Sequence, residues 1–488
     1  MRFFLFIAAA CFISSVQAAD APKPVDHEAL INEKLSKGVT PQNNACVLLW
    51  KAFGPKAEDS GVIHPLYFKT LGIESPPERG VYFQSLSMFA KVRLERTEEE
   101  RKALKETLTK AMNRPWSRNE YPELADWLDA NDKPLATIVE ASKRSDYFSP
   151  ILAVRMNGAR ASLYSANLPT LQVTRSAGAA LCCRAMFKVK NGEAESAFAD
   201  LMAVQRLARL VARGGSMTEA MMAVVIDLAA EESLISWLNS TNSTKLREHL
   251  GELLELASLP PLEATFQIER LMLLEVVDRL RVQGTGVLKH MMEAMEFTPN
   301  GEEREQLERV DFQSTVKTVN GMIDRCIAVV RLKGHDARMK EIEKLIDEVK
   351  ARALSPWNEE VLTVLLRLGK TGAEIGDNIG KILMTMVFRS LEKIQNARDL
   401  TGQTRDNLLV AFALAAHKAD HGEYPSTLDA LAPKYLKAVP ADLFTGKPLN
   451  YSTDGKSFRL YSAGANGKDD GGHADDIVVS HPLDKPKP

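Results

Sequence analysis

An acidic, glycine-rich segment near the carboxyl end combines residue types suited to binding a hard cation. Asn466, Asp469, Asp470, Asp475 and Asp476 fall within eleven residues. Four glycines are interspersed with them, Gly464, Gly467, Gly471 and Gly472. Calcium takes six to eight oxygens from carboxylates, amides and backbone carbonyls, and glycines let the backbone turn its carbonyls inward. The pattern predicts a calcium site at these five residues, and the alternative is an ordinary solvated acidic turn.

A helix and short strands should position this loop. Apolar residues between Leu408 and Ala416 predict a helix over 405–420, which His421-Gly422 ends. Three segments have strand composition, namely 449–452, 458–462 and 477–480. Asp454-Gly455, between the first two, is a hairpin turn signal. We therefore expect a helix packed on a small antiparallel sheet.

A series of short motifs runs through this stretch. In order they are Gly422-Glu423-Tyr424-Pro425, Leu428 and Leu431, Tyr435-Leu436, Pro440-Ala441-Asp442 with Gly446 and Pro448, Tyr461 to Gly467, and Asp476-Ile477. Their order over about 403–480 resembles the calcium-binding globular domain of the major pseudopilin of type II secretion. The resemblance implies a small pseudopilin-like α+β domain over 403–482, with a structural calcium.

The chain departs from that family at two places. Asn466 stands where the family has a loop aspartate, so one charge is lost, and Asp469 or Asp470 can replace it. The amino-terminal residues 1–5 lack the family's glycine processing site and the glutamate that follows it. We therefore do not expect assembly into a filament.

Other candidate sites are weaker. The chain lacks H-E-x-x-H, G-x-S-x-G, Walker and dinucleotide motifs. His417 and His421 are four residues apart and could bind one metal, but histidines at a helix end also interact with the exposed carbonyls, which we favour. Glu231-Glu232 and the series Glu269, Glu275 and Asp278 have spacings that occur on most helices, so we assign them no catalytic role.

Composition indicates a globular chain without an overall charge that would favour a polyanion. A chain of 488 residues is long enough for two or three domains, and its 45% of apolar residues are ample for a buried core. Lys plus Arg number 62 and Asp plus Glu number 64, which gives a net charge of -2 and argues against binding to nucleic acid.

The first eighteen residues have the pattern of a secretory signal peptide. Arg2 precedes an apolar run from Phe3 to Ile13, and Val16 and Ala18 suit the small-residue cleavage rule. The alternative is a membrane anchor, but the run is shorter than the roughly 20 residues that span a bilayer. We expect a periplasmic or secreted protein with no membrane span after cleavage.

Four cysteines follow the signal, Cys46, Cys182, Cys183 and Cys326. An exported protein can form disulfides. Cys182 and Cys183 are neighbours in a helical pattern and point about 100° apart, so bonding to each other would strain the helix. Pairing with Cys46 or Cys326 stays open, and so does a set of buried free thiols.

Residues 19–400 are dominated by helix-period patterns and match no family that we can name. Segments 181–190 and 194–212 predict an antiparallel helix pair around Asn191-Gly192, followed by a helix over 218–238. Further helices are expected at 245–257, 261–297, 302–332, 336–353, 359–368 and 378–396. This predicts a mainly α chain, an irregular helical bundle or short solenoid. A sub-boundary is possible near 150–165, a seam is expected at Thr401-Gly402-Gln403, and 483–488 should be a disordered tail.

These observations lead to three hypotheses about function. The first is an exported, non-enzymatic scaffold or binding protein of the cell envelope, with a structural calcium and a protein partner. The second is an extracytoplasmic hydrolase whose site lies in a cleft of the helical region, which convergent polar side chains in a deep pocket would favour. The third is an accessory protein of a type II secretion or pilus system.

Overall fold

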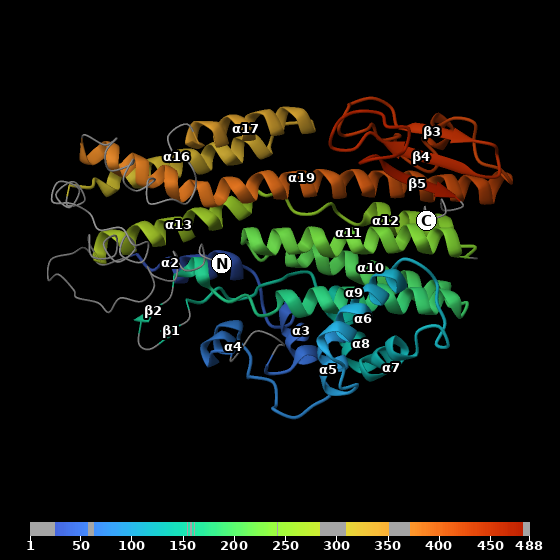
Figure 1. Ribbon diagram of the computed structural model, residues 1–488, viewed down its shortest axis with the longest axis horizontal. Coiled ribbons are helices and arrows are strands. Elements are labelled where there is room, and N and C mark those ends of the chain that lie inside the picture. Colours follow the sequence, from blue (N-terminus) through green and yellow to red (C-terminus); the bar gives the residue numbers. More distant parts are fainter. Residues whose placement is uncertain are drawn as a thin grey trace.

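The computed structural model shows a mainly helical chain with a three-stranded antiparallel sheet near its carboxyl end (Figure 1). It describes residues 25–56, 63–153, 155–156, 159–160, 162–241, 243–283, 309–350 and 371–481. The predicted signal peptide, the tail at 483–488 and the helix at 359–368 lie outside these residues. The expectation of a mainly α fold is confirmed.

Short helices form the amino-terminal part. They are α2 (His27–Ser36), α3 (Ala45–Phe53), α4 (Pro65–Leu71), α5 (Leu86–Val92), α6 (Glu98–Met112), α7 (Pro122–Ala130) and α8 (Asp132–Ser142). Side chains fix where several of these helices begin. Asn44 accepts the backbone N–H of Cys46 before α3, and Thr97 and Glu100 form a reciprocal capping box at the start of α6.

Two short strands and a turn of 3-10 helix follow α8. β1 (Arg155–Met156) and β2 (Ala159–Arg160) pair antiparallel, and η1 (Leu163–Ser165) comes before the next helix. They lie within residues 150–165, where a sub-boundary stays a prediction. Glu275 anchors this segment to the body of the molecule, because its carboxylate accepts a hydrogen bond from the Ser162 hydroxyl at 3.1 Å.

Three long helices form the middle of the molecule. They are α9 (Leu171–Lys190), α10 (Ala194–Val211) and α11 (Met217–Ser240), which pack on one another. The predicted pair around Asn191-Gly192 is present, and α9 begins earlier than the predicted Leu181. Gly192 has a φ of 81°, a left-handed conformation that favours glycine and lets the chain reverse here. Phe198 and Trp237 are buried at the interface of α10 and α11.

The carboxyl-terminal half begins with α12 (Leu246–Glu255), α13 (Glu263–Gln283), α16 (Phe312–Val330) and α17 (His335–Lys350). The last helix is α19 (Gly372–His421), which runs unbroken for 50 residues. Figure 1 shows it as a long rod with the sheet at its carboxyl end and α16 and α17 beside its amino-terminal half. It ends at His421, one residue beyond the predicted end, and Gly422 after it is left-handed with a φ of 86°.

The predicted seam at Thr401-Gly402-Gln403 is wrong, because these residues lie inside α19. A helical glycine costs only about 1 kcal/mol relative to alanine. Contacts around it offset that cost, since Thr401 and Gln403 are buried and the Gln403 side chain accepts the backbone N–H of Leu443 at 2.6 Å. Tertiary contacts therefore keep the helix continuous.

The helices surround two large hydrophobic cores, and α19 contributes to both. Leu391 and Ile394 belong to a core with α13, α16 and α17. Leu408 and Phe412 belong to a second core with α3 and α9 to α11, which also includes residues of the sheet. The sheet therefore shares its core with the preceding helices.

The sheet consists of β3 (Asn450–Thr453), β4 (Phe458–Ser462) and β5 (Ile477–His481), in the order β3-β4-β5. Tyr451 pairs with Leu460, and Leu460 pairs with Val479. Leu460 and Val479 are buried in the core, and β4 and β5 contact α19. The predicted strands and the turn at Asp454-Gly455 are confirmed, as is a helix packed on a small antiparallel sheet.

The four described cysteines are buried free thiols. Burial raises the pKa of Cys46, Cys182 and Cys326 to about 12, so these sulfurs stay protonated at neutral pH. The sequence left open either a disulfide or a set of free thiols. The structure contains free thiols at Cys46, Cys182, Cys183 and Cys326.

Candidate metal site

The acidic segment forms the loop between β4 and β5, and both of its ends are anchored. Asn407 on α19 donates a hydrogen bond to the carbonyl of Ile477 at 2.8 Å, at the end of the loop. At its start, the backbone N–H of Ala463 donates to Asp442 at 2.8 Å. The loop is thereby held against α19 and against the segment that precedes the sheet.

Glycine conformation decides the path of the loop. Gly467, Gly471 and Gly472 have φ values of 65°, 69° and 76°, in the left-handed region. Gly464 has a different role, since a Cβ placed there would lie 2.0 Å from the carbonyl oxygen of Asp475. The glycines therefore permit the tight turns and the close backbone approach that bring the two ends of the loop together.

Three of the five predicted ligands come together. The side-chain amide nitrogen of Asn466 lies 2.9 Å from Asp470 Oδ2 and 2.5 Å from Asp475 Oδ1. The backbone N–H of Asn466 also donates to Asp475 Oδ2 at 2.8 Å. Two carboxylates from opposite sides of the loop thus converge on one amide group.

The other two predicted ligands have separate partners. Asp476 Oδ2 accepts the backbone N–H groups of Asp470 at 3.1 Å and Gly472 at 2.7 Å. Asp476 Oδ1 is buried and has no hydrogen-bond partner in the described part of the chain. Asp469 Oδ1 accepts the hydroxyl of Tyr461 at 3.1 Å. Within the residues that the structure describes, no three Asp, Glu, His or Cys side chains gather as a complete metal-binding group.

Two residues that shape the loop were not assigned a role from the sequence. Asp442 is buried and, besides Ala463, accepts the backbone N–H of Phe444 at 2.8 Å, so it fixes the turn beneath the loop. It belongs to the Pro440-Ala441-Asp442 motif, which was the available signal. Arg459 on β4 donates to the carbonyl of Gly472 at 2.7 Å and places a positive charge beside the carboxylates.

The histidine pair at the end of α19 forms a close contact between tilted rings. The His417 and His421 rings lie 4.3 Å apart, and His417 Nδ1 is 3.1 Å from the carbonyl oxygen of Glu423. Because Nδ1 donates to that carbonyl, His417 fixes the chain just beyond the helix.

Several helical carboxylates are buried. Glu269 accepts the backbone N–H of Met217 at 2.8 Å and the hydroxyl of Tyr164 at 2.7 Å. Glu231 is fully buried, and neither of its oxygens has a hydrogen-bond partner among the described residues. Burial raises the pKa of this carboxyl well above its usual range. The sequence showed the acidic residues but not their burial.

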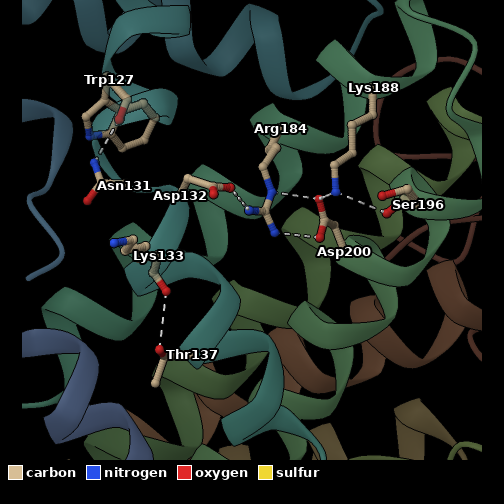
Figure 2. Close-up of polar contacts among 9 residues, drawn as sticks. All are labelled: Trp127, Asn131, Asp132, Lys133, Thr137, Arg184, Lys188, Ser196 and Asp200. Carbon is tan, nitrogen blue, oxygen red and sulfur yellow. Dashed lines mark hydrogen bonds and ion pairs between the residues drawn. The ribbon is translucent and has the colours of Figure 1, made fainter. Parts of the chain in front are cut away.

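A third polar cluster lies between α9 and α10 (Figure 2). Both oxygens of the buried Asp200 accept hydrogen bonds from Arg184, at 2.7 and 2.9 Å, and Lys188 donates to the same carboxylate at 2.7 Å. Asp132, at the start of α8, lies 3.7 Å from Arg184. The central carboxylate is fully paired, so this cluster joins three helices and offers no open position for a substrate.

Comparisons with known protein families, with curated proteins and with solved structures found no match. Among the helices described here, including the long α19, none combines the length and apolarity needed to cross a membrane.

Proposed function

We propose that this chain is an exported, non-enzymatic scaffold or binding protein of the cell envelope whose β4–β5 loop binds a structural calcium ion. The convergence of Asn466, Asp470 and Asp475 on one point of the loop carries the proposal. The order of pseudopilin-like motifs and the secretory pattern of residues 1–18 support it. Calcium is near millimolar outside cells, where weak sites suffice.

Binding requires one local change. The Asn466 amide presents its nitrogen to Asp470 and Asp475. Turning that amide by 180° presents its oxygen instead, which is an acceptor and a suitable calcium ligand. The turn breaks the hydrogen bond that Asn466 Oδ1 accepts from the backbone N–H of Lys468 at 2.6 Å, and the calcium contact must offset that loss. Together the two carboxylates and the amide oxygen supply three ligands, and backbone carbonyls and water complete the shell.

The ion would stabilise a loop that has little apolar burial of its own. Asn466, Asp469 and Asp475 are exposed, as are most of the residues from 465 to 475. Ordering such a segment costs roughly 1 to 2 kcal/mol per residue in backbone entropy, which few buried contacts offset here. A bound cation also removes the repulsion between the converging carboxylates.

Chelation tests the proposal on the full chain. We expect calcium to bind with a Kd of about 0.1 to 1 mM, the range of extracellular sites. At 10 mM calcium, a Kd of 1 mM stabilises the folded state by about 1.4 kcal/mol relative to excess EDTA. Calorimetric titration measures the affinity, and thermal unfolding with calcium, magnesium or EDTA measures the stabilisation.

Variants locate the site. Asp470→Asn combined with Asp475→Asn should abolish the calcium-dependent rise in melting temperature. Asp429→Asn is the matched control, because Asp429 is exposed and lies outside the loop. An unchanged melt in EDTA, or an undiminished calcium response in the double variant, contradicts the proposal.

A further inference from the structure

An open cleft of about 530 Å³ lies where α8, α10 and α12 end. Five of its lining residues are cationic, namely Lys143, Arg144, Arg206, Arg209 and Arg213. The other described lining residues are serines and apolar residues, and none of them is acidic. The cleft therefore brings together positive charges from segments far apart in the sequence.

Part of this positive charge is used by backbone carbonyls of the adjoining loops. Arg209 Nε donates to the carbonyl of Ala257 at 2.6 Å, Arg213 donates to the carbonyl of Ser145, and Arg144 donates to that of Gln42. Each guanidinium has five N–H donors, so these contacts orient the arginines and leave further donors available.

The carboxylates around the cleft neutralise it incompletely. Glu252 is 3.9 Å from Arg206, and Asp146 is 3.8 Å from Arg213. These long ion pairs are partly exposed to solvent, where such pairs contribute little. None of these carboxylates lines the cleft, so its surface presents the cations.

Arg209 is buried, in contrast to its neighbours in the cleft. Its side chain is 8% exposed, against 35% for Arg206 and 48% for Arg213. Its guanidinium pairs with the buried Asp227 at 2.5 Å, while Nη2 is buried with no partner among the described residues. A buried arginine with an unfilled donor gains from a second counter-charge nearby.

We propose that this cleft binds a small molecule carrying two or more phosphate or carboxylate groups. The planar guanidinium fork matches both groups in bidentate geometry. The volume lies within the range of small-molecule sites, and Leu210 and Leu256 offer apolar contact to an uncharged part of the ligand. This proposal is independent of the calcium loop, whose residues take no part in it.

Calorimetric titration of the full chain with pyrophosphate and with citrate tests the proposal. Calcium is removed beforehand on a chelating resin, and the titrations are run in calcium-free buffer without EDTA. Both anions chelate calcium, and EDTA carries four carboxylates of its own that would compete for the cleft. The result then does not depend on the cation site. We expect saturable binding of at least one anion, weakened by added sodium chloride. Binding of pyrophosphate alone assigns the cleft to phosphates, and binding of citrate alone assigns it to carboxylates.

Charge-removing variants place the binding in the cleft. Arg144→Gln combined with Arg206→Gln should weaken binding at least tenfold, the change expected for losing charged hydrogen bonds. Arg79→Gln combined with Arg93→Gln removes the same charge from exposed positions outside the cleft and should leave the affinity unchanged. Unfolding curves confirm that both variants are folded.

Three results would overturn the proposal. They are the absence of saturable binding by either anion, equal affinity in the cleft variant and the wild type, and equal weakening in both double variants. Binding to phosphatidylglycerol vesicles without binding to pyrophosphate or citrate would also overturn it, since the cleft would then recognise a lipid surface.

Discussion

Replacing Glu219 with glutamine should change how the stability of the protein depends on pH. Glu219 is fully buried at the start of α11. Its Oε2 accepts hydrogen bonds from the backbone N–H and hydroxyl of Ser216, at 3.1 and 2.8 Å, and its Oε1 is buried with no partner within the described ranges. Glutamine keeps the acceptor and the shape but cannot ionise.

The size of this change in stability follows from the shift in the pKa of Glu219. Burial, opposed by the hydrogen bonds from Ser216 and assisted by the nearby charge of Glu269, raises the pKa of Glu219 from 4.5 to about 7. A shift of this size corresponds to about 3 kcal/mol. The folded state holds the proton more tightly than the unfolded state, so this group destabilises the fold progressively from pH 4.5 to 7. Below pH 4.5 the penalty is absent, and above pH 7 it is complete.

Urea unfolding at pH 4.5, 6, 7 and 8.5 measures the effect. The free energy of unfolding of Glu219→Gln should rise relative to the wild type by about 3 kcal/mol between pH 4.5 and pH 8.5. Any constant cost of placing the amide cancels in this difference. Glu99→Gln, at an exposed position of α6, is the control. Parallel stability curves for Glu219→Gln and the wild type would refute the reasoning.

Three further predictions concern α19 and the core, each measured by urea unfolding. Gly402→Ala should stabilise the protein by about 1 kcal/mol, because the site is helical, exposed and open to an added Cβ; destabilisation would contradict a continuous helix. Asp227→Asn should cost about 3 kcal/mol by leaving Arg209 buried without its counter-charge, and a neutral result would refute that pairing. Phe412→Ala should cost about 4 kcal/mol, since Phe412 is buried and stacks on Trp237; a loss below 1 kcal/mol would contradict this packing.

The fold was most predictable where local signals decide the structure. The strands near Leu460 and the turn at Asp454-Gly455 follow from composition within a few residues, and both are present. The continuity of α19 was not predictable in this way. In the sequence, Gly402 has the pattern of a helix end. The helix continues because Gln403 accepts a hydrogen bond from Leu443, forty residues away.

The candidate site was predictable as a segment but not as a geometry. Glycines and carboxylates identify the loop, yet which side chains meet depends on the φ angles of Gly467, Gly471 and Gly472. The sequence does not show which of the loop aspartates approaches Asn466. In the structure Asp475 does so, whereas Asp469 contacts Tyr461. The basic cleft could not be predicted from the sequence. Lys143 and Arg213 are seventy residues apart and have the pattern of ordinary surface charges, and only folding brings them together.

The length of α19 has a consequence for dissection of the molecule. Fifty residues at 1.5 Å each give a rod of about 75 Å, and its two halves are embedded in different cores. A fragment that starts near residue 400 would lack the first half of α19. It would also lack Trp237 on α11, the aromatic residue on which Phe412 stacks. We therefore expect that the carboxyl-terminal sheet does not fold as a separate unit, and that melting of one core propagates along the shared helix into the other.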